Sequence, residues 1–336
     1  MRQGEALFDD GEKQVGAQGS PDLYAHSVLG YAEKGLEIAS WGDHLNLHEA
    51  ATSKTYCKEK KEILAASGLD CWAISNHLAG QLISDPNDDA RSDAFCLDDS
   101  CRGNAEKKRQ WAVNQMLDAA DAAKNMGVDV VTGFMGSPIW HMWYSFPPVT
   151  KAEVDAGFRR VRELFSPIFE KFRKNGIRFA LEVHPTEIAF DIWSSERLLR
   201  EFDGDEVLGF NFDPSHLLWQ GMNPVKFLRR FADRIYHVHM KDVAVALDGE
   251  SGILGSHLDS GDGRRGWDFR SLGHGQVDFD GIIRALNAAN YQGPLSVEWE
   301  DPGMDREFGA RESCDFVRRV DFPASDRDFD GAFAAE

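Results

Sequence analysis

Two histidines lie two residues apart in the segment RIYHVHMKD, residues 234–242. Their apolar neighbours predict a buried strand, and side chains two apart on a strand point to the same side. His237 and His239 therefore face one direction, with His239 nearer to the end of the strand. This arrangement suits a metal ligand, His239, and a deeper neighbour, His237, that helps to orient it.

Carboxylate side chains lie at the ends of three other strands that the sequence predicts. Glu182 follows an apolar run in LEVHP, Asp213 does so in FDPSH, and Glu298 does so in VEWED. Three carboxylates that meet in one place repel one another strongly, and a divalent cation removes this conflict. We therefore expect Glu182, Asp213, His239 and Glu298 to hold a metal ion; the alternative is that each is a solvated strand end. Oxygen-rich ligation with one nitrogen favours Mn²⁺ or Mg²⁺ over zinc, and Co²⁺ or Fe²⁺ also fits.

An alternation of strand-like and helix-like segments must position these side chains. Continuous apolar strands joined by helical crossovers predict a parallel sheet that is covered on both faces. Eight such units close into a (β/α)8 TIM barrel, whose chemistry gathers at the carboxyl ends of its strands. A doubly wound open sheet is the alternative, but no glycine-rich dinucleotide fingerprint follows the first strands. The predicted strands are 36–41, 70–77, 128–136, 177–184, 207–213, 235–240 and 295–301, with a weak candidate at 5–10. The predicted helices are 48–68, 105–127, 151–176, 194–203, 223–234, 278–293 and about 304–319.

Length and charge narrow the class of protein further. The 336 residues suit one large barrel, so we expect a single domain over 1–336 with a loop insertion at about 84–104 and a long loop at about 243–276. With 37 basic against 56 acidic residues the net charge is −19, which disfavours a nucleic-acid partner. We see no signal-peptide pattern and no apolar run of about 18 residues, so we expect a cytoplasmic enzyme without a membrane partner.

Two smaller patterns each leave two interpretations open. Cys96 and Cys101 share a polar loop and could form a zinc or redox pair, or could be two free thiols. Arg264 and Arg265 could bind a phosphate or carboxylate, or could pair with some of the many acidic residues.

Five segments together resemble a known family. The segments LEVHPTEIAFD, FNFDPSHLLWQG, IYHVHMKD, GHGQVDFDGIIRAL and LSVEWED are similar to the sugar phosphate isomerase/epimerase family, the xylose isomerase-like TIM barrels, over about residues 30–320. The resemblance implies a metal held by Glu182, Asp213, His239 and Glu298. It also implies that Glu182 and Glu298 shuttle protons and that His216 contacts substrate hydroxyls.

The segment GSPIWHMWYSFPP, residues 136–148, resembles one branch of that family more closely. This branch is the large subunit of bacterial C-glycoside deglycosidases, which act on 3-oxo-glycosides and pair with a small β-rich subunit. The resemblance implies that His141 acts as a base. The aromatic residues Trp140, Trp143, Tyr144 and Phe146 could stack on a flat aglycone, or could serve loop packing or a subunit interface.

These observations predict a divalent-metal-dependent enzyme that abstracts a proton next to a sugar carbonyl. The leading specific interpretation is cleavage of 3-oxo-glycosides by elimination, which can break a C–C bond. The alternatives are a sugar isomerase or ketose 3-epimerase, and a non-catalytic sugar-binding barrel; an apurinic endonuclease would need more histidine ligands and a basic groove. We expect an oligomer with an oxidised sugar or glycoside as its small-molecule partner. The predicted substrate-binding residues are His77, His184, His216, Arg264 and Trp140.

Overall fold

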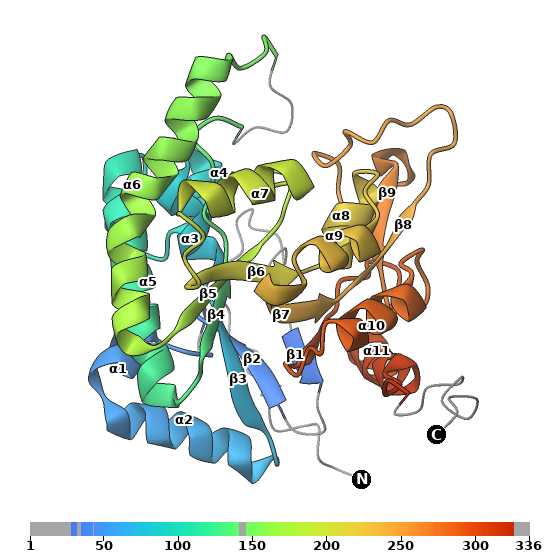
Figure 1. Cartoon of the computed structure of the whole chain (residues 1–336), viewed down its shortest axis with the longest axis horizontal. Helices are drawn as coiled ribbons and strands as arrows, with labels where there is room; N and C mark the ends of the chain where they lie inside the picture. Colours follow the sequence, from blue (N-terminus) through green and yellow to red (C-terminus); the bar gives the residue numbers. More distant parts are fainter. Residues whose placement is uncertain (1–27, 32–34, 43, 141–145, 326–336) are drawn as a thin grey trace, which may run out of the picture.

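A barrel-like sheet forms the centre of the computed structural model, which describes residues 28–31, 35–42, 44–140 and 146–325 (Figure 1). Within these residues seven strands run parallel in the order β10-β7-β6-β5-β4-β3-β2. Each strand is short, and most of its residues are buried except in the first half of β3, as expected for a sheet that is covered on its outer face. The strands are β2 (Gly35–Ala39), β3 (Asp70–Ser75), β4 (Val130–Gly133), β5 (Arg178–Glu182), β6 (Leu208–Phe212), β7 (Ile235–Met240) and β10 (Leu295–Glu298).

The strand β1 (Val28–Tyr31) occupies the remaining position in the barrel wall. It pairs antiparallel with β10 and also lies beside β2, so the barrel is nearly closed. The predicted TIM barrel is therefore confirmed, but the expectation of eight β/α units is wrong at this position. Only three residues separate β1 from β2, too few for a helical crossover, and the two strands consequently run in opposite directions. The weak strand predicted at 5–10 lies outside the described residues.

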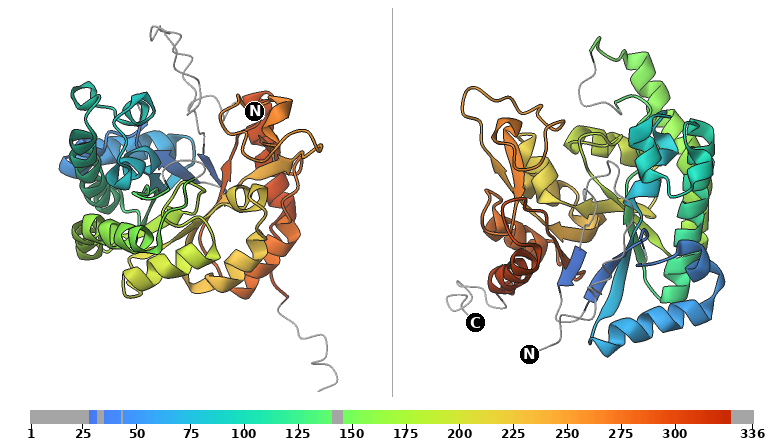
Figure 2. Two further views of the ribbon diagram at one scale, coloured as in Figure 1. Left: turned by 90° about the horizontal axis from the view of Figure 1, so that it is seen from above. Right: turned by 180° about the vertical axis from the view of Figure 1, so that it is seen from behind.

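Helices lie outside the strands in both views of Figure 2. The longest, α6, turns a run of buried phenylalanines towards the sheet, where Phe165, Phe169 and Phe172 pack on Phe179 of β5. The helices are α1 (Leu47–Thr52), α2 (Lys54–Ala66), α3 (His77–Ser84), α5 (Ala105–Met126), α6 (Lys151–Asn175), α7 (Ile192–Glu201), α8 (Pro214–Trp219), α9 (Pro224–Arg230), α10 (Phe279–Ala288) and α11 (Arg306–Val320).

The helix predicted over 48–68 is interrupted at Ser53. This residue has an extended backbone, ends α1 and begins α2, and its side chain accepts a hydrogen bond from the backbone N–H of Tyr56. Serine competes for backbone hydrogen bonds in this way, so it favours a cap over a helix interior. The helix predicted over 223–234 likewise ends at Arg230, and the short 3₁₀ turn η2 (Ala232–Arg234) follows it.

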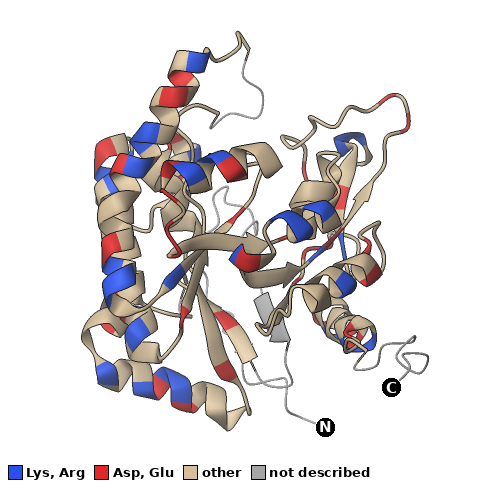
Figure 3. Cartoon of the chain, viewed as in Figure 1, with Lys and Arg blue, Asp and Glu red and all other residues tan. Residues whose placement is uncertain are grey.

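Charges of both signs alternate along the outer helices, as Figure 3 shows for α2 and α6. Several of them form pairs one helical turn apart, such as Lys58 with Glu62 and Lys151 with Asp155. These residues form the solvated faces of amphipathic helices. No helix in the described part of the chain is both long and apolar enough to cross a membrane.

Both predicted loops contain short elements. Residues 84–104 include the helix α4 (Ala90–Phe95) and the turn η1 (Asp99–Cys101). Cys96 and Cys101 are buried free thiols there, and no third metal-binding side chain among the described residues joins them. Residues 243–276 include most of a two-stranded antiparallel sheet, β8 (Asp242–Val245) with β9 (Trp267–Arg270), and the turn η3 (Gly263–Arg265).

Asp242 ties the end of this long loop to the barrel. Its buried carboxylate accepts hydrogen bonds at 2.8 to 3.1 Å from the backbone N–H groups of Val243, Gly273, Gly275 and Val277. A side chain at Gly275 could not fit, because its Cβ would lie 2.2 Å from Asp242 Oδ1. The last residue of the segment HVHMKD therefore has a structural role.

Candidate metal centre

The four predicted metal ligands converge at the carboxyl ends of four consecutive strands of the sheet. Glu182 ends β5, Asp213 follows β6, His239 lies near the end of β7 and Glu298 ends β10. One ligand atom from each residue lies within 4.8 Å of the other three, and all four residues are buried. The structure thus brings together the set chosen from the sequence, although its role as a metal site stays a prediction.

Hydrogen bonds fix one oxygen of the Asp213 carboxylate, whereas the other oxygen accepts none from the described residues. Its Oδ1 accepts hydrogen bonds from the backbone N–H and the hydroxyl of Ser215 at 2.7 and 2.6 Å, because Asp213 is the N-cap of α8. Its Oδ2 is buried and accepts no hydrogen bond from the described residues, although His216 Nε2 lies 3.4 Å from it. A buried carboxylate oxygen without a hydrogen bond is costly, and a bound cation would remove that cost.

The imidazole of His239 lies between two of the carboxylates. Its Nδ1 is 3.0 Å from Glu182 Oε2 and 2.7 Å from Glu298 Oε2. Although burial by itself raises the pKa of Glu182, contacts with His216, His239 and His77 together hold that pKa well below its usual value. Ionised carboxylates and an imidazole nitrogen that point to a common centre are the donors that divalent cations bind.

Three further histidines, which the sequence predicted as substrate-binding residues, lie close to this centre or to one another. His77 Nε2 lies 3.2 Å from Glu182 Oε2, and His216 Nε2 lies 3.2 Å from Glu182 Oε1. The ring of His184 packs edge-on against His216 with centroids 4.4 Å apart. His77 is the first residue of α3 and not the last of a strand, and its Nδ1 lies 2.7 Å from Ser75 Oγ. Contact between these histidines and a substrate stays a prediction.

The remaining predicted residues lie elsewhere or outside the described residues. Trp140 packs between Phe158 and Phe190, and its indole N–H donates to the carbonyl of Glu187. Arg264 is exposed and pairs with Asp262, so the structure shows pairing with an acidic residue. The predicted base His141, with Trp143 and Tyr144, falls outside the described residues.

Lys241 contributes a buried positive charge whose role was not predicted from the sequence. Its Nζ lies 3.0 Å from Glu298 Oε1, 2.8 Å from Glu300 Oε1, and 4.1 Å from the ring centroid of Phe269. Asn211 on β6 was also missed, and its side-chain amide donates to Glu182 Oε2 at 2.9 Å. Neither contact has a local signal, because each joins residues on different strands.

Glu37 was missed as well, although the sequence carries a signal for it. It is the one charged residue in the apolar segment LEIASW, and a carboxylate inside a predicted buried strand is costly unless it has partners. In the structure its Oε2 lies 2.8 Å from the Nε2 atoms of both His237 and His239.

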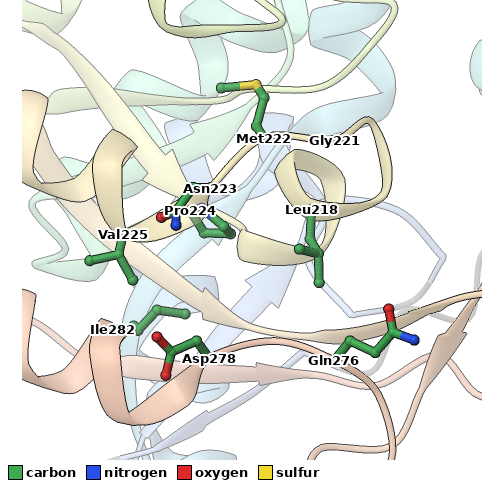
Figure 4. Close-up of a pocket in the computed structure, with 9 residues that line it drawn as sticks. All are labelled: Leu218, Gly221, Met222, Asn223, Pro224, Val225, Gln276, Asp278 and Ile282. Carbon is green, nitrogen blue, oxygen red and sulfur yellow. The ribbon is translucent and has the colours of Figure 1, made fainter.

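A separate cavity of about 180 Å³ lies on the outside of the barrel (Figure 4). Its walls come from the α8–α9 segment, which contributes Leu218, Pro224 and Val225, and from Ile282 of α10. None of the four converging ligands lines it, and Asp278 is the one charged residue in its walls. The candidate metal centre is therefore separate from this cavity.

The fold and the site define a class of protein: a TIM barrel with a centre of three carboxylates and one imidazole at its strand ends. Residues 30–320 match the sequence model of one protein family, the xylose isomerase-like TIM barrel. The chain belongs to the xylose isomerase-like TIM barrel family.

The chain matches only part of the length of each of two curated relatives. The uncharacterized protein YfiH of Bacillus subtilis (strain 168) is 29% identical over 186 residues, which are 52% of this chain and 58% of that protein. Inosose dehydratase of Clostridium botulinum (strain Eklund 17B / Type B) is 37% identical over 94 residues, 28% of this chain and 31% of the dehydratase.

Three solved structures share the fold at low sequence identity. The 3-keto-D-glucoside 4-epimerase YcjR from E. coli has a TM-score of 0.56 and 16% identity, covering 81% of this chain and 87% of its own. The IOLI protein with a bound zinc atom has a TM-score of 0.55 and 17% identity, covering 85% and 86%. A xylose isomerase-like barrel protein from Mycobacterium smegmatis in complex with magnesium has a TM-score of 0.55 and 20% identity, covering 85% and 83%.

Proposed function

We propose that this protein is a divalent-metal-dependent enzyme that removes a proton next to the carbonyl group of an oxidised carbohydrate. The observation that carries the proposal is the convergence of Glu182, Asp213, His239 and Glu298 within 4.8 Å. The zinc and magnesium in two structures of the same fold support a cation there. The ion is proposed to be Mn²⁺, with Mg²⁺ or Co²⁺ as alternatives for this donor set.

A cation bound there would act as a Lewis acid that stabilises the enolate oxygen formed when the proton leaves. The two glutamates then differ in their ability to accept that proton. Glu298 Oε1 is bound by the ammonium group of Lys241, a charged donor that weakens it as a base. Glu182 is contacted by three imidazoles and one amide but by no ammonium group, so we assign the proton transfer to Glu182. A positioned base of this kind contributes about 10²–10⁴ in rate.

Cleavage of 3-oxo-glycosides by elimination is the specific reaction that we propose. Glu182 takes the proton from C2 of the sugar, a C1–C2 double bond forms, and the group on C1 leaves with the electron pair of its bond and is then protonated. The similarity to an inosose dehydratase supports elimination, because a dehydratase expels water. Isomerisation or 3-epimerisation is the alternative, in which the proton returns to carbon; structures titled L-ribulose 3-epimerase and 3-keto-D-glucoside 4-epimerase favour it.

The charges around the centre favour an uncharged substrate. Lys241, the buried ammonium group beside the four converging ligands, is already paired with Glu298 and Glu300. A phosphate group on the substrate would therefore face carboxylates, which repel it.

Incubation of the purified protein with a 3-oxo-C-glycoside in deuterated buffer, with Mn²⁺ or with EDTA, tests the proposal. Metal-dependent release of the aglycone, followed by chromatography, supports elimination, whereas deuterium uptake without release supports isomerisation or epimerisation. Glu182→Gln should lower either rate by at least about 100-fold. A protein that binds the glycoside but neither releases the aglycone nor exchanges the proton would be a sugar-binding barrel, and the proposal would be wrong.

A small β-rich second subunit, an oligomeric assembly and a cytoplasmic location complete the proposal. Co-purification followed by size-exclusion chromatography tests the first two. A single species with the mass of one chain, 37.6 kDa, would contradict both.

A further inference from the structure

We propose that Glu37 is a positioning residue that fixes the ring of His239 from inside the barrel, so that Nδ1 of this ring faces the metal centre. The inference rests on the metal centre of the proposed function. It concerns ion binding and ring orientation, however, and can be tested whether or not the protein turns over a sugar.

Glu37 lies one layer below the four converging ligands. It is on β2, which β1 and β10 separate from β7 in the barrel wall, and its side chain is fully buried. Its Oε2 lies 2.8 Å from Nε2 of His239 and 2.8 Å from Nε2 of His237. Its Oε1 accepts a hydrogen bond from the hydroxyl of Thr132 on β4 at 2.5 Å. The carboxylate is therefore fixed at both oxygens.

These contacts decide which nitrogen of His239 carries a hydrogen. A carboxylate offers only lone pairs, so the Nε2 atom that faces Glu37 must be the N–H donor. Nδ1 also faces carboxylates, at 3.0 Å from Glu182 and 2.7 Å from Glu298, so without an ion the same rule would place a hydrogen there too. A cation bound at the centre would take the place of that hydrogen, and Nδ1 would then present its lone pair to the ion while Nε2 keeps the N–H. Two carboxylate oxygens and a lone pair directed at one point form a site for a cation, and the hydrogen bond to Glu37 holds the ring in that orientation.

Polar residues continue this layer across the barrel. His237 Nε2 also lies 2.8 Å from Ser296 Oγ on β10, so Glu37, Thr132, His237 and Ser296 join four strands. Branched apolar side chains usually fill the interior of such barrels. Here buried ionisable groups replace them, and burying such groups costs free energy. A role in orienting His239 accounts for that cost.

The same atoms could instead hold a second cation, because Glu37, His237 and His239 also offer three ligand atoms within 4.8 Å of one another. We favour hydrogen bonds, since a single oxygen lies at hydrogen-bond distance from both nitrogens and the serine and threonine hydroxyls add to the same network. The two interpretations predict different ion counts, one or two per chain.

Metal affinity of a Glu37→Gln variant is the first test. Chelator-stripped wild-type and variant proteins are titrated with Mn²⁺ in a calorimeter, and circular dichroism confirms that both are folded. The variant should bind Mn²⁺ about 10–100-fold more weakly. Asp85→Asn is the matched control: Asp85 is also buried and accepts hydrogen bonds from Ser137 N–H and Gln81, but it touches no ligand. It should bind Mn²⁺ within about twofold of wild type.

The protonated nitrogen of His239 is the second test, and it does not depend on the variant's folding. Long-range ¹H–¹⁵N spectra of ¹⁵N-histidine-labelled wild type, loaded with diamagnetic Mg²⁺ or Zn²⁺, should show His239 with hydrogen on Nε2 only. Hydrogen on Nδ1, an unchanged affinity in a folded Glu37→Gln protein, or a second ion that this variant loses would each overturn the inference. Wild type that binds no ion would refute the metal centre itself, whereas ion binding without aglycone release would refute only the proposed reaction.

Discussion

Replacing Lys241 with methionine should destabilise the metal-free protein strongly. The ammonium group is 2% exposed and contacts two carboxylates, one of which, Glu298, is itself 7% exposed. Methionine has a similar volume, so little of the effect should come from a cavity. What the variant loses is the positive charge that compensates carboxylates in a buried place.

The expected size of this loss follows from the burial of the pair. Removing one partner of a buried ion pair costs about 3–5 kcal/mol, because it leaves the other charge in a poorly solvated site. The cation–π contact with Phe269 adds about 1 kcal/mol at such a site. The pair with Glu300 should add less, because that side chain is 28% exposed and water screens it. We therefore expect Lys241→Met to lower the free energy of unfolding by about 4 kcal/mol at neutral pH.

Urea unfolding of EDTA-treated protein measures this change. A double variant, Lys241→Met with Glu298→Gln, should be more stable than the sum of the two single effects by at least about 1 kcal/mol, since the unpaired charge is gone. Lys171→Met is the control; its pair with Asp121 is about one third exposed on both sides and should contribute less than about 1 kcal/mol. A Lys241→Met effect as small as that of the control, with additive single effects, would refute the argument.

Three further predictions concern a metal ligand, the hydrogen bonds of Asp242 and a titrating group. Asp213→Asn should weaken Mn²⁺ binding by more than about 100-fold in calorimetry, because the open Oδ2 is the proposed ligand atom; binding within about threefold of wild type would exclude that role. Gly275→Ala should lower the free energy of unfolding by about 2–3 kcal/mol in urea, since a Cβ would lie 2.2 Å from Asp242 Oδ1, and an unchanged midpoint would contradict a structural role for the Asp242 hydrogen bonds. Burial raises the pKa of Asp85 from 3.8 to about 6. Between these pH values the carboxyl group is protonated in the folded protein but has lost its proton in the unfolded chain. The stability from this proton is present at low pH and is lost as the pH rises towards 6. Relative to Asp85→Asn, wild type should therefore lose about 3 kcal/mol between about pH 4 and about pH 7 in urea titrations; parallel pH profiles would refute the assignment.

The structure confirmed the predicted barrel because strand and helix signals are local. Each parallel strand could be placed within a few residues from its apolar run, and α5 and α6 from their apolar period and the glycines that end them, Gly127 and Gly176. One error arose where a single capping side chain interrupts a helix, as at Ser53. Another arose where a strand joins the parallel sheet in the antiparallel direction, as β1 does. Pairing between β1 and β10 joins the two ends of the barrel and leaves no local pattern.

The sequence by itself determined that the strands are buried and parallel. It also determined which acidic and imidazole side chains lie at their ends. Parallel strands joined by helices must present their carboxyl ends at one end of the barrel. Glu182, Asp213, His239 and Glu298 therefore come together when the barrel closes. Only the tertiary structure decided which groups surround them. Glu37 contacts His239 across 202 residues of chain, and Lys241 contacts Glu298 across 57. Such contacts depend on the register between strands and on closure of the barrel, which the packing of the whole sheet sets and no local spacing records.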